Sequence, residues 1–213
     1  MKIGNELKLL LAKNLFRFED LEFSTEKIQG ILNEKVEALN SIDLDDLAIL
    51  NDIRRLFEYI EEINIKELCI EVEFYKTLNG ILAFNQSLDP GRFREGNQLV
   101  YISSIKDPIN PAPLSFIKER LELLSHLDKD NYKKVVSRVF CQLCKAQPFF
   151  DGNKRSTLCL CNAALLKQKL GVMLIKNELY PQFDKLLTKF YADNDEELLF
   201  FLETMCFYEQ EIY

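Results

Sequence analysis

The segment AQPFFDGNKRST, residues 146–157, separates the two most apolar helical patterns of the chain and contains its sharpest break. Pro148 removes a backbone donor and disfavours helix at Gln147, so the first pattern is predicted to end there. The Asp-Gly-Asn sequence at 151–153 predicts a turn, because Asp and Asn tolerate unusual dihedrals and Gly accepts positive φ. A second helix is therefore predicted to begin at about Asn153.

Helical periodicity continues on both sides of this turn. After it, residues 158–166 (LCLCNAALL) are apolar on every face, which is typical of a helix that is buried all round. The sequence thus predicts an all-α fold built around this central helix. Before the turn, residues 131–146 carry a single apolar stripe, formed by Tyr132, Val135, Val136, Val139, Phe140 and Leu143.

The rest of the chain is predicted to be mostly helical, with one long loop. Residues 87–115 hold four of the six prolines and two of the seven glycines, which predicts a functional loop with a short extended piece at Gln98–Ile102. Without a repeat or a linker, residues 1–213 are predicted to form a single domain, with N-terminal helices at about 1–64 and a core at about 65–213. Further helices are expected at 5–16, 25–38, 44–63, 66–84, 114–127, 178–191 and 195–208.

Composition and charge narrow the classes of function. The chain has 213 residues, of which 47% are hydrophobic and 29% charged, a balance that can bury a sizeable core. Its formal charge of −7 argues against a broad nucleic-acid interface, so any bound anion needs a local site. No apolar run reaches the ~18 residues of a membrane span, and Met1–Glu6 does not resemble the start of a signal peptide. We therefore expect a cytoplasmic protein that binds neither nucleic acid nor membrane.

The cysteines raise the question of a zinc site. Cys141 and Cys144 precede the turn, and Cys159 and Cys161 follow it. Both pairs fall inside helical patterns, where residues two apart point to different faces, whereas structural zinc needs four ligands converging on one tetrahedron. We favour their interpretation as buried small hydrophobic residues in a reducing compartment. The only histidine, His126, is interpreted as a surface residue near a helix end.

The start of the helix at Asn153 is a candidate anion site. The first backbone N–H groups of a helix are unpaired and its dipole is positive there, so such an end binds phosphate well. Lys154 and Arg155 lie in the first turn, where cations cost stability unless an anion is present. Asp151 adds a carboxylate suited to a Mg²⁺ ion that bridges to phosphates. The alternative is a plain turn in which Asp151 caps the helix and both cations face solvent.

The nine residues Gln147–Arg155, QPFFDGNKR, resemble the Fic motif, HPFx(D/E)GN(G/K)R, at eight of nine positions. The resemblance covers most of residues 23–170 and implies a Fic-type helical domain with a short β-hairpin flap. Other segments follow in the family's order. Thr25–Gly30 (TEKIQG) matches the frame of the N-terminal inhibitory motif, (S/T)xxxE(G/N). Asp89–Arg94 resembles the segment before the flap, Asn97–Ile102 would be the flap strand, and Pro111–Leu127 would be the helix after it.

By this resemblance the chain would transfer AMP from ATP, or a group from another nucleotide, to a hydroxyl of a target protein. Asp151 would bind Mg²⁺, and Gly152 and Asn153 would form the anion hole. Arg155 would contact the β and γ phosphates. Lys154 would be a further nucleotide-binding residue. A lysine at this position is also found in Doc, a member of the family that phosphorylates its target instead.

The chain departs from the family's pattern at three positions. The family's His, which takes the proton from the attacking hydroxyl, is Gln147 here, and a neutral carboxamide is no useful base near pH 7. Loss of a positioned base typically costs ~10²–10⁴ in rate. The inhibitory Glu is replaced by Gln29, within the frame set by Thr25 and Gly30, and its partner, a second Arg, is replaced by Leu158. We interpret the neutral residues Gln29 and Leu158 as the loss of an inhibitory contact in a chain whose transferase activity is also lost.

The sequence therefore predicts a Fic-type protein that keeps a Mg²⁺–nucleotide site but is impaired as a transferase, and acts as a nucleotide-binding or regulatory protein. Its target protein would dock on the flap at 97–102 by strand addition. Two alternatives stay open. One is a working transferase that modifies a protein hydroxyl without the usual base, since phosphoryl transfer depends mostly on positioning and electrostatics. The other is a helical interaction module without a ligand.

Overall fold

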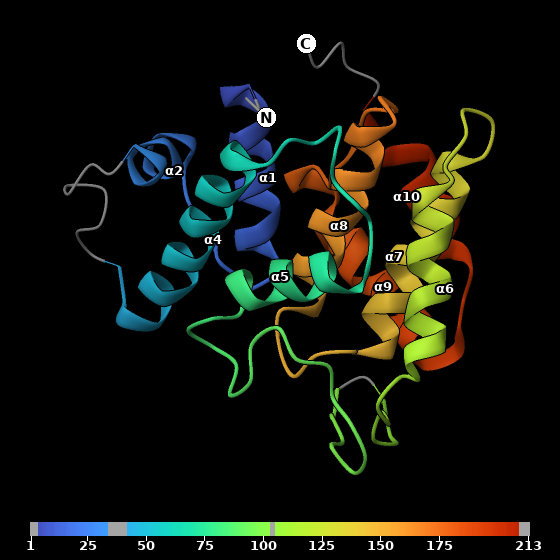
Figure 1. Cartoon of the computed structure of the whole chain (residues 1–213). Helices are drawn as coiled ribbons and strands as arrows, with labels where there is room; N and C mark the ends of the chain where they lie inside the picture. The colour runs from blue at the N-terminus through green and yellow to red at the C-terminus, as the bar shows by residue number, and fades with distance from the viewer. Residues whose placement is uncertain (1–3, 34–41, 103–104, 209–213) are drawn as a thin grey trace.

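A computed structural model of the chain describes residues 4–33, 42–102 and 105–208. Most of these residues are helical, which confirms the predicted all-α class. Within the described residues, no helix is long and apolar enough to cross a membrane. In chain order the elements are α1 (Asn5–Arg17), α2 (Thr25–Leu32), α4 (Leu44–Glu62), α5 (Val72–Leu82), α6 (Leu114–Ser125), α7 (Tyr132–Ala146), α8 (Asn153–Lys167), β1 (Val172–Met173), the 3₁₀ turn η1 (Asn177–Leu179), α9 (Tyr180–Asp193), α10 (Glu197–Met205) and β2 (Phe207–Tyr208) (Figure 1).

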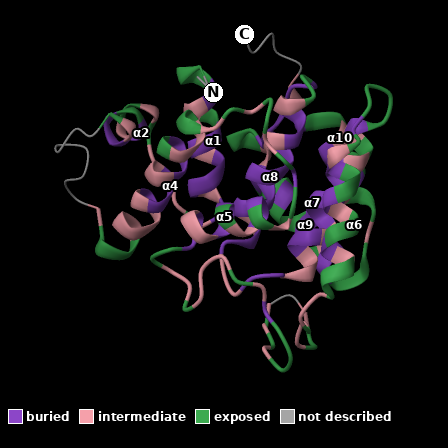
Figure 2. Cartoon of the chain, viewed as in Figure 1, coloured by how far each residue is buried: buried purple, intermediate pink, exposed green. Residues whose placement is uncertain are grey.

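Helix α8 occupies the middle of the fold. It packs against α5, α6, α7 and β1, and eleven of its fifteen residues are buried (Figure 2). Leu158, Leu160 and Cys161 are fully buried, so the run that the sequence predicted to form a central helix does so. Because α8 is enclosed by other elements along its length, its first turn and the chain before it are held in a defined position.

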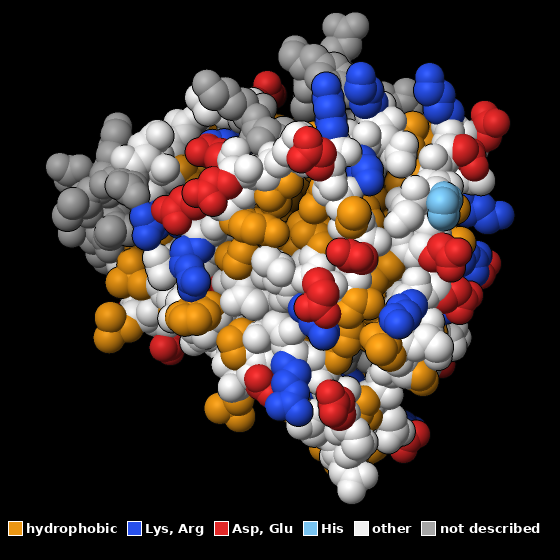
Figure 3. All heavy atoms as spheres, viewed as in Figure 1, with side chains coloured by type: hydrophobic (Ala, Val, Ile, Leu, Met, Phe, Trp, Pro, Cys, Tyr) orange, Lys and Arg blue, Asp and Glu red, His pale blue; other side chains and the backbone are white. Residues whose placement is uncertain are grey.

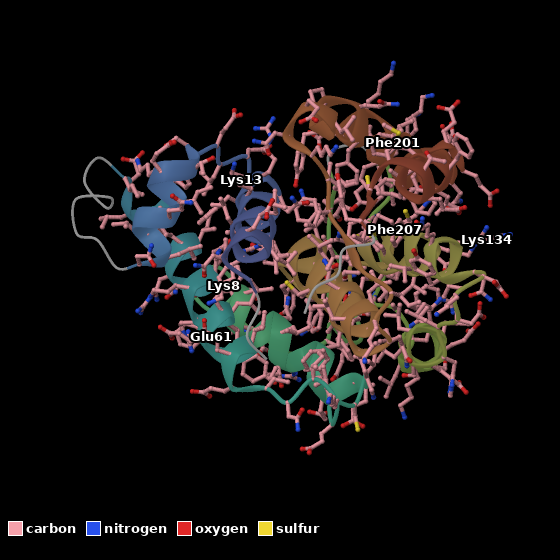
Figure 4. The ribbon with its side chains drawn as sticks, turned by 90° about the horizontal axis from the view of Figure 1, so that it is seen from above. Lys8, Lys13, Glu61, Lys134, Phe201 and Phe207 are labelled. Atoms are coloured by element: carbon pink, nitrogen blue, oxygen red, sulfur yellow. The ribbon has the colours of Figure 1, made fainter. Side chains whose placement is uncertain are left out.

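The N-terminal helices pack on one side of this core. Helix α1 contacts α2 and α4, and α4 packs against α5. Lys8 of α1 forms an ion pair with Glu61 of α4 (Figure 4). The buried side chain of Asn14 donates to the carbonyl of Ile175 at 3.0 Å and accepts from the amide of Ile175 at 2.7 Å. Helix α1 is therefore fixed both to α4 and to the segment that follows β1.

Two helix boundaries in the first half of the chain differ from the sequence prediction. The helix expected from residue 66 begins only at Val72, because Asn64 starts a turn. The Asn64 carbonyl accepts from the Glu67 amide at 3.0 Å and its Oδ1 accepts from the Lys66 amide at 3.3 Å, and such local bonds compete with helix. The helix expected at 25–38 is α2, which ends at Leu32, and residues 34–38 of that prediction lie outside the described residues.

A small antiparallel sheet was not predicted. Strands β1 and β2 pair Val172 with Tyr208 and Met173 with Phe207. The prediction of helix over 195–208 was wrong at its end, since α10 stops at Met205. Strands of two residues carry no measurable periodicity, and their pairing joins segments that are distant in the sequence, so the local pattern held no signal for them.

The long loop forms a short hairpin at the position of the predicted flap. Val100 and Ile109 exchange both backbone hydrogen bonds, with N···O distances of 3.2 and 2.8 Å. Residues 103–104, between them, lie outside the described residues. Leu99 and Tyr101 are 40% and 73% exposed, so the extended piece presents apolar side chains to solvent.

Candidate functional site

The turn between α7 and α8 is built from two residues in the left-handed region. Helix α7 ends at Ala146, and Gln147 follows with φ 46° and ψ 58°. Gly152, at φ 70°, directly precedes α8, which begins at Asn153 as the sequence predicted. A non-glycine residue at positive φ costs free energy and persists only where its surroundings hold it, so the conformation of Gln147 needs an explanation from its contacts.

Side-chain amides supply that explanation. Asn153 Oδ1 accepts from the Phe149 amide at 2.9 Å, and Asn153 Nδ2 donates to Gln147 Oε1 at 2.8 Å. Gln147 Nε2 in turn donates to the Cys144 carbonyl at 2.6 Å, near the end of α7. Both polar atoms of the Gln147 side chain are therefore engaged in joining the two helices.

Asn79 fixes the same turn from α5. Its fully buried side chain donates from Nδ2 to the Asp151 carbonyl at 2.8 Å, and its Oδ1 accepts from the Gly91 amide at 3.0 Å. A Cβ on Gly152 would lie 3.1 Å from Asn79 Nδ2 and 3.0 Å from Ala83 Cβ, so glycine permits this close approach as well as the positive φ. Asn79 was not predicted from the sequence, although a polar residue within an apolar helical pattern is a usable signal.

Arg94 holds the base of the flap against the end of α7, and the sequence analysis did not assign it a role. Its side chain is 2% exposed, and its own amide donates to the Pro148 carbonyl at 2.9 Å. Within the described part of the chain, the guanidinium donates to backbone carbonyls alone: those of Gln147 (2.7 Å), Gln98 (2.5 Å), Ile109 (2.9 Å), Asn110 (3.3 Å) and Ala146 (3.4 Å).

The first turn of α8 has the features of an anion site. No side chain caps this helix end within the described residues. Lys154 is half-buried, with Nζ 5.6 Å from the centre of the Phe18 ring. The Asp151 side chain is 44% exposed and its Oδ1 lies 3.6 Å from Arg155 Nη2. Asp151 therefore does not cap the helix in the manner of a plain turn, because its Oδ1 accepts from the adjacent Gly152 amide.

Arg155 is fully buried and already has partners. Its Nη1 donates to the Leu82 carbonyl at 2.7 Å, and its Nη2 donates to Gln86 Oε1 at 2.8 Å. Glu19, just beyond α1, places Oε1 2.7 Å from Arg155 Nε. The Nε–H bond is not aligned with this carboxylate, so the contact is an ion pair rather than a hydrogen bond. The Glu19 carboxylate thus contacts the arginine to which the resemblance assigns phosphate binding. This contact was not predicted from the sequence.

Acidic groups surround the two cations. Burial raises the pKa of Glu19, while the adjacent Arg155 opposes that rise. Burial also raises the pKa of Asp184 on α9, against the influence of Lys154. No group of three or more His, Cys, Asp or Glu side chains in the described part of the chain is placed to hold a metal ion. A Mg²⁺ ion here would depend on Asp151 and on the phosphates of a nucleotide, which suits an ion that keeps most of its waters.

The residues of the expected inhibitory motif do not meet. Thr25 accepts from Lys13 Nζ at 2.7 Å. Gln29 is exposed on α2 and Gly30 is buried, while Leu158 is fully buried in the core. Figures 1 and 4 both show α2 on the far side of α1 from α8. The structure therefore does not bring Gln29 to Leu158, and the carboxylate that reaches the motif comes from Glu19 instead.

The other candidate residues lie elsewhere. His126 caps the C-terminal end of α6 and is exposed, as predicted. The cysteines flanking the turn are buried with free thiols, and burial raises the pKa of each, including Cys144 and Cys159 to about 12. Thiols with such pKa values stay protonated near neutral pH, so they are poor nucleophiles.

Comparison with known proteins returned no match to a protein-family model and no match to a curated protein.

Proposed function

We propose that this chain is a Fic-type protein that binds a Mg²⁺–nucleotide at the start of α8 and serves as a nucleotide-binding or regulatory protein. The observation that carries the proposal is the α8 N-terminus, which has no side-chain cap and stands beside Lys154 and Asp151. Its free N–H groups and dipole, together with a cation, favour a phosphate group. The docking of a target protein on the flap and a cytoplasmic location stay predictions from the sequence.

Gln147 supports the view that transfer chemistry is impaired. Its carboxamide has no proton-accepting function near neutral pH, and both of its polar atoms are engaged with Asn153 and Cys144. His126 offers no replacement, because it lies at the C-terminal end of α6 and lines a hollow that contains no residue of the turn between α7 and α8. The site is therefore suited to binding a nucleotide rather than to deprotonating a hydroxyl.

The first experiment is thermal unfolding with Mg²⁺–ADP and Mg²⁺–ATP. Binding should raise the melting temperature, with a gain of about 2.7 kcal/mol at about a hundredfold excess over the dissociation constant. Lys154→Ala should weaken binding about tenfold, because it removes a cation beside the phosphate. Lys134→Ala is the matched control, since Lys134 is exposed in the first turn of α7 (Figure 4), whereas α8 begins after the opposite end of α7. If millimolar nucleotide shifted neither the wild type nor Glu19→Gln, the proposed function would be wrong.

A second prediction concerns Glu19, which a phosphate must displace to reach Arg155. Apparent affinity falls with the fraction of molecules that are competent to bind, so Glu19→Gln should bind Mg²⁺–ADP about tenfold more tightly at neutral pH. The pKa of Glu19 is raised by burial, so this side chain loses its charge at a higher pH than an exposed Glu. As the pH is lowered from neutral toward the ordinary pKa of a glutamate, the wild type should approach the variant in affinity. Titration calorimetry at several pH values measures this, and equal affinities throughout would contradict it.

A further inference from the structure

A continuous groove lies between the start of α5 and one side of α6. Two hollows, with volumes of about 760 and 380 Å³, share Val72, Glu73 and Lys118 in their walls. The larger hollow extends to the turn at 92–96 and to residues 110–114, and the smaller one extends along α6 to His126. We call the two together the α5–α6 groove. It does not include the start of α8 or any residue of the proposed nucleotide site.

The groove combines an apolar lining with charged margins. Figure 3 shows this character on the face in view, where hydrophobic side chains lie between Lys or Arg and Asp or Glu side chains. Apolar residues lie along its whole length: Val72, Phe93, Ala112, Leu114 and Leu121. Leu114 is 48% exposed, so part of this lining is open to a partner.

The two ends of the groove differ in charge. Four cations (Lys76, Arg92, Arg94, Lys118) and two carboxylates (Glu73, Glu95) line the larger hollow. Three carboxylates (Glu71, Glu73, Glu122) and a single lysine, Lys118, line the smaller one, beside His126. The end at the flap is therefore net positive and the end at His126 is net negative, with an apolar stretch between them.

We propose that the α5–α6 groove binds an extended peptide segment of a partner protein, with an acidic residue at the flap end, a basic residue at the His126 end and apolar residues between. The charge pattern complements such a segment, and the length agrees with it. Along α6 the groove runs from Leu114 to the residue after the helix, His126, and the twelve residues of this helix span about 18 Å at ~1.5 Å per residue. An extended peptide covers that length with about five or six residues at ~3.3 Å each.

The flap end of the groove has a direct structural link to the helix turn. Arg94 lines this end and donates to the carbonyls of Gln147 and Ala146. A peptide in the groove therefore contacts the residue that holds the flap against α7. Binding of a peptide to the groove does not require a nucleotide. A failure of peptide binding and a failure of nucleotide binding are therefore separate results.

Selection from a random heptapeptide display library against the full chain tests the proposal. Enriched sequences should carry Asp or Glu toward one end and Lys or Arg toward the other. A synthetic peptide of the enriched sequence should bind about tenfold more weakly to Lys76→Glu/Arg92→Glu and to Glu122→Lys, because each variant places like charges together. The ion pairs of Lys76 with Glu73 and of Arg92 with Asp89 are exposed, so their loss leaves the fold intact.

Glu119→Lys is the matched control, because Glu119 is exposed on the same helix but does not line the groove. The peptide should bind this variant as it binds the wild type. Absence of enrichment, enrichment of uniformly acidic or uniformly basic peptides, or a peptide that binds all variants equally would each overturn the proposal.

Discussion

Replacing Arg94 by Met is expected to lower the free energy of unfolding by about 3 to 5 kcal/mol, the largest loss of stability that we predict for a single polar side chain. The guanidinium satisfies carbonyls from both sides of the flap and from the end of α7, including those of Gln147 at 2.7 Å and Ile109 at 2.9 Å. Met fills a similar volume but donates no hydrogen bond, so these buried acceptors are left without their donor. Urea unfolding followed by circular dichroism measures the loss.

Two neighbouring variants make this expectation specific. Arg92 lies two residues earlier, with a side chain that is 58% exposed and paired to Asp89 at 3.2 Å, so Arg92→Met should cost about 0–1 kcal/mol. Arg94→Lys should fall between the two, because an ammonium cannot reproduce the planar fork that reaches several carbonyls at once. Equal stabilities for Arg94→Met and Arg92→Met would show that Arg94 does not hold the flap base.

The helices and their ends were predictable where the sequence pattern involves residues that are close together in the chain. Helix α8 was found from an apolar run with no polar face, and its start at Asn153 followed from the turn chemistry before it. The end of α7 at Ala146 followed from Pro148. These features depend on residues within a few positions of one another, which a single sequence displays directly.

The missed features depend on residues that are far apart in the sequence. Glu19 meets Arg155, Asn79 meets Asp151, and Arg94 meets Gln147, and in each case neither partner predicts the other. The same holds for β1 and β2, which pair although they are far apart in the sequence. Of the candidate site, the sequence located the turn and its residue types, whereas the contacts that fill it became visible only in the structure.

Gln147 explains how the turn between α7 and α8 keeps its shape. The residue sits in a left-handed conformation that suits few non-glycine side chains, and its carboxamide ties Asn153 to Cys144. A His at this position is compatible with that backbone, because His, like Asn and Asp, is enriched at positive φ. A His ring donates and accepts one hydrogen bond each, so it can replace the bridging role of the carboxamide in part. The turn should therefore accept a base without rearrangement.

We predict that Gln147→His produces adenylyl transfer that exceeds any wild-type rate by about 10²–10⁴. The imidazole would take the proton from an attacking hydroxyl, whose oxygen bonds to the α-phosphorus as pyrophosphate leaves. Incubation with α-labelled ATP, with and without lysate, measures transfer to the chain itself or to a target. Gln147→Asn is the matched control, since Asn tolerates the same backbone conformation but supplies no base. It should stay inactive.

The structure also predicts which second substitution should increase adenylyl transfer by the Gln147→His variant. Leu158→Arg would introduce the second arginine that the resemblance to the Fic family implies, but Leu158 is fully buried in the core, and an unpaired charge there is costly. Glu19→Gln removes one carboxylate from Arg155, which keeps its ion pair with Asp151, so a phosphate can take the place of Glu19. Gln147→His/Glu19→Gln should therefore exceed Gln147→His alone, a coupling that a double-mutant cycle measures. Asp151→Ala in the Gln147→His background should abolish transfer while the chain stays folded, because Glu19 still pairs with the buried Arg155 in that variant. If the double variant bound nucleotide tightly and still transferred nothing, the missing base would not be what separates this site from an active one.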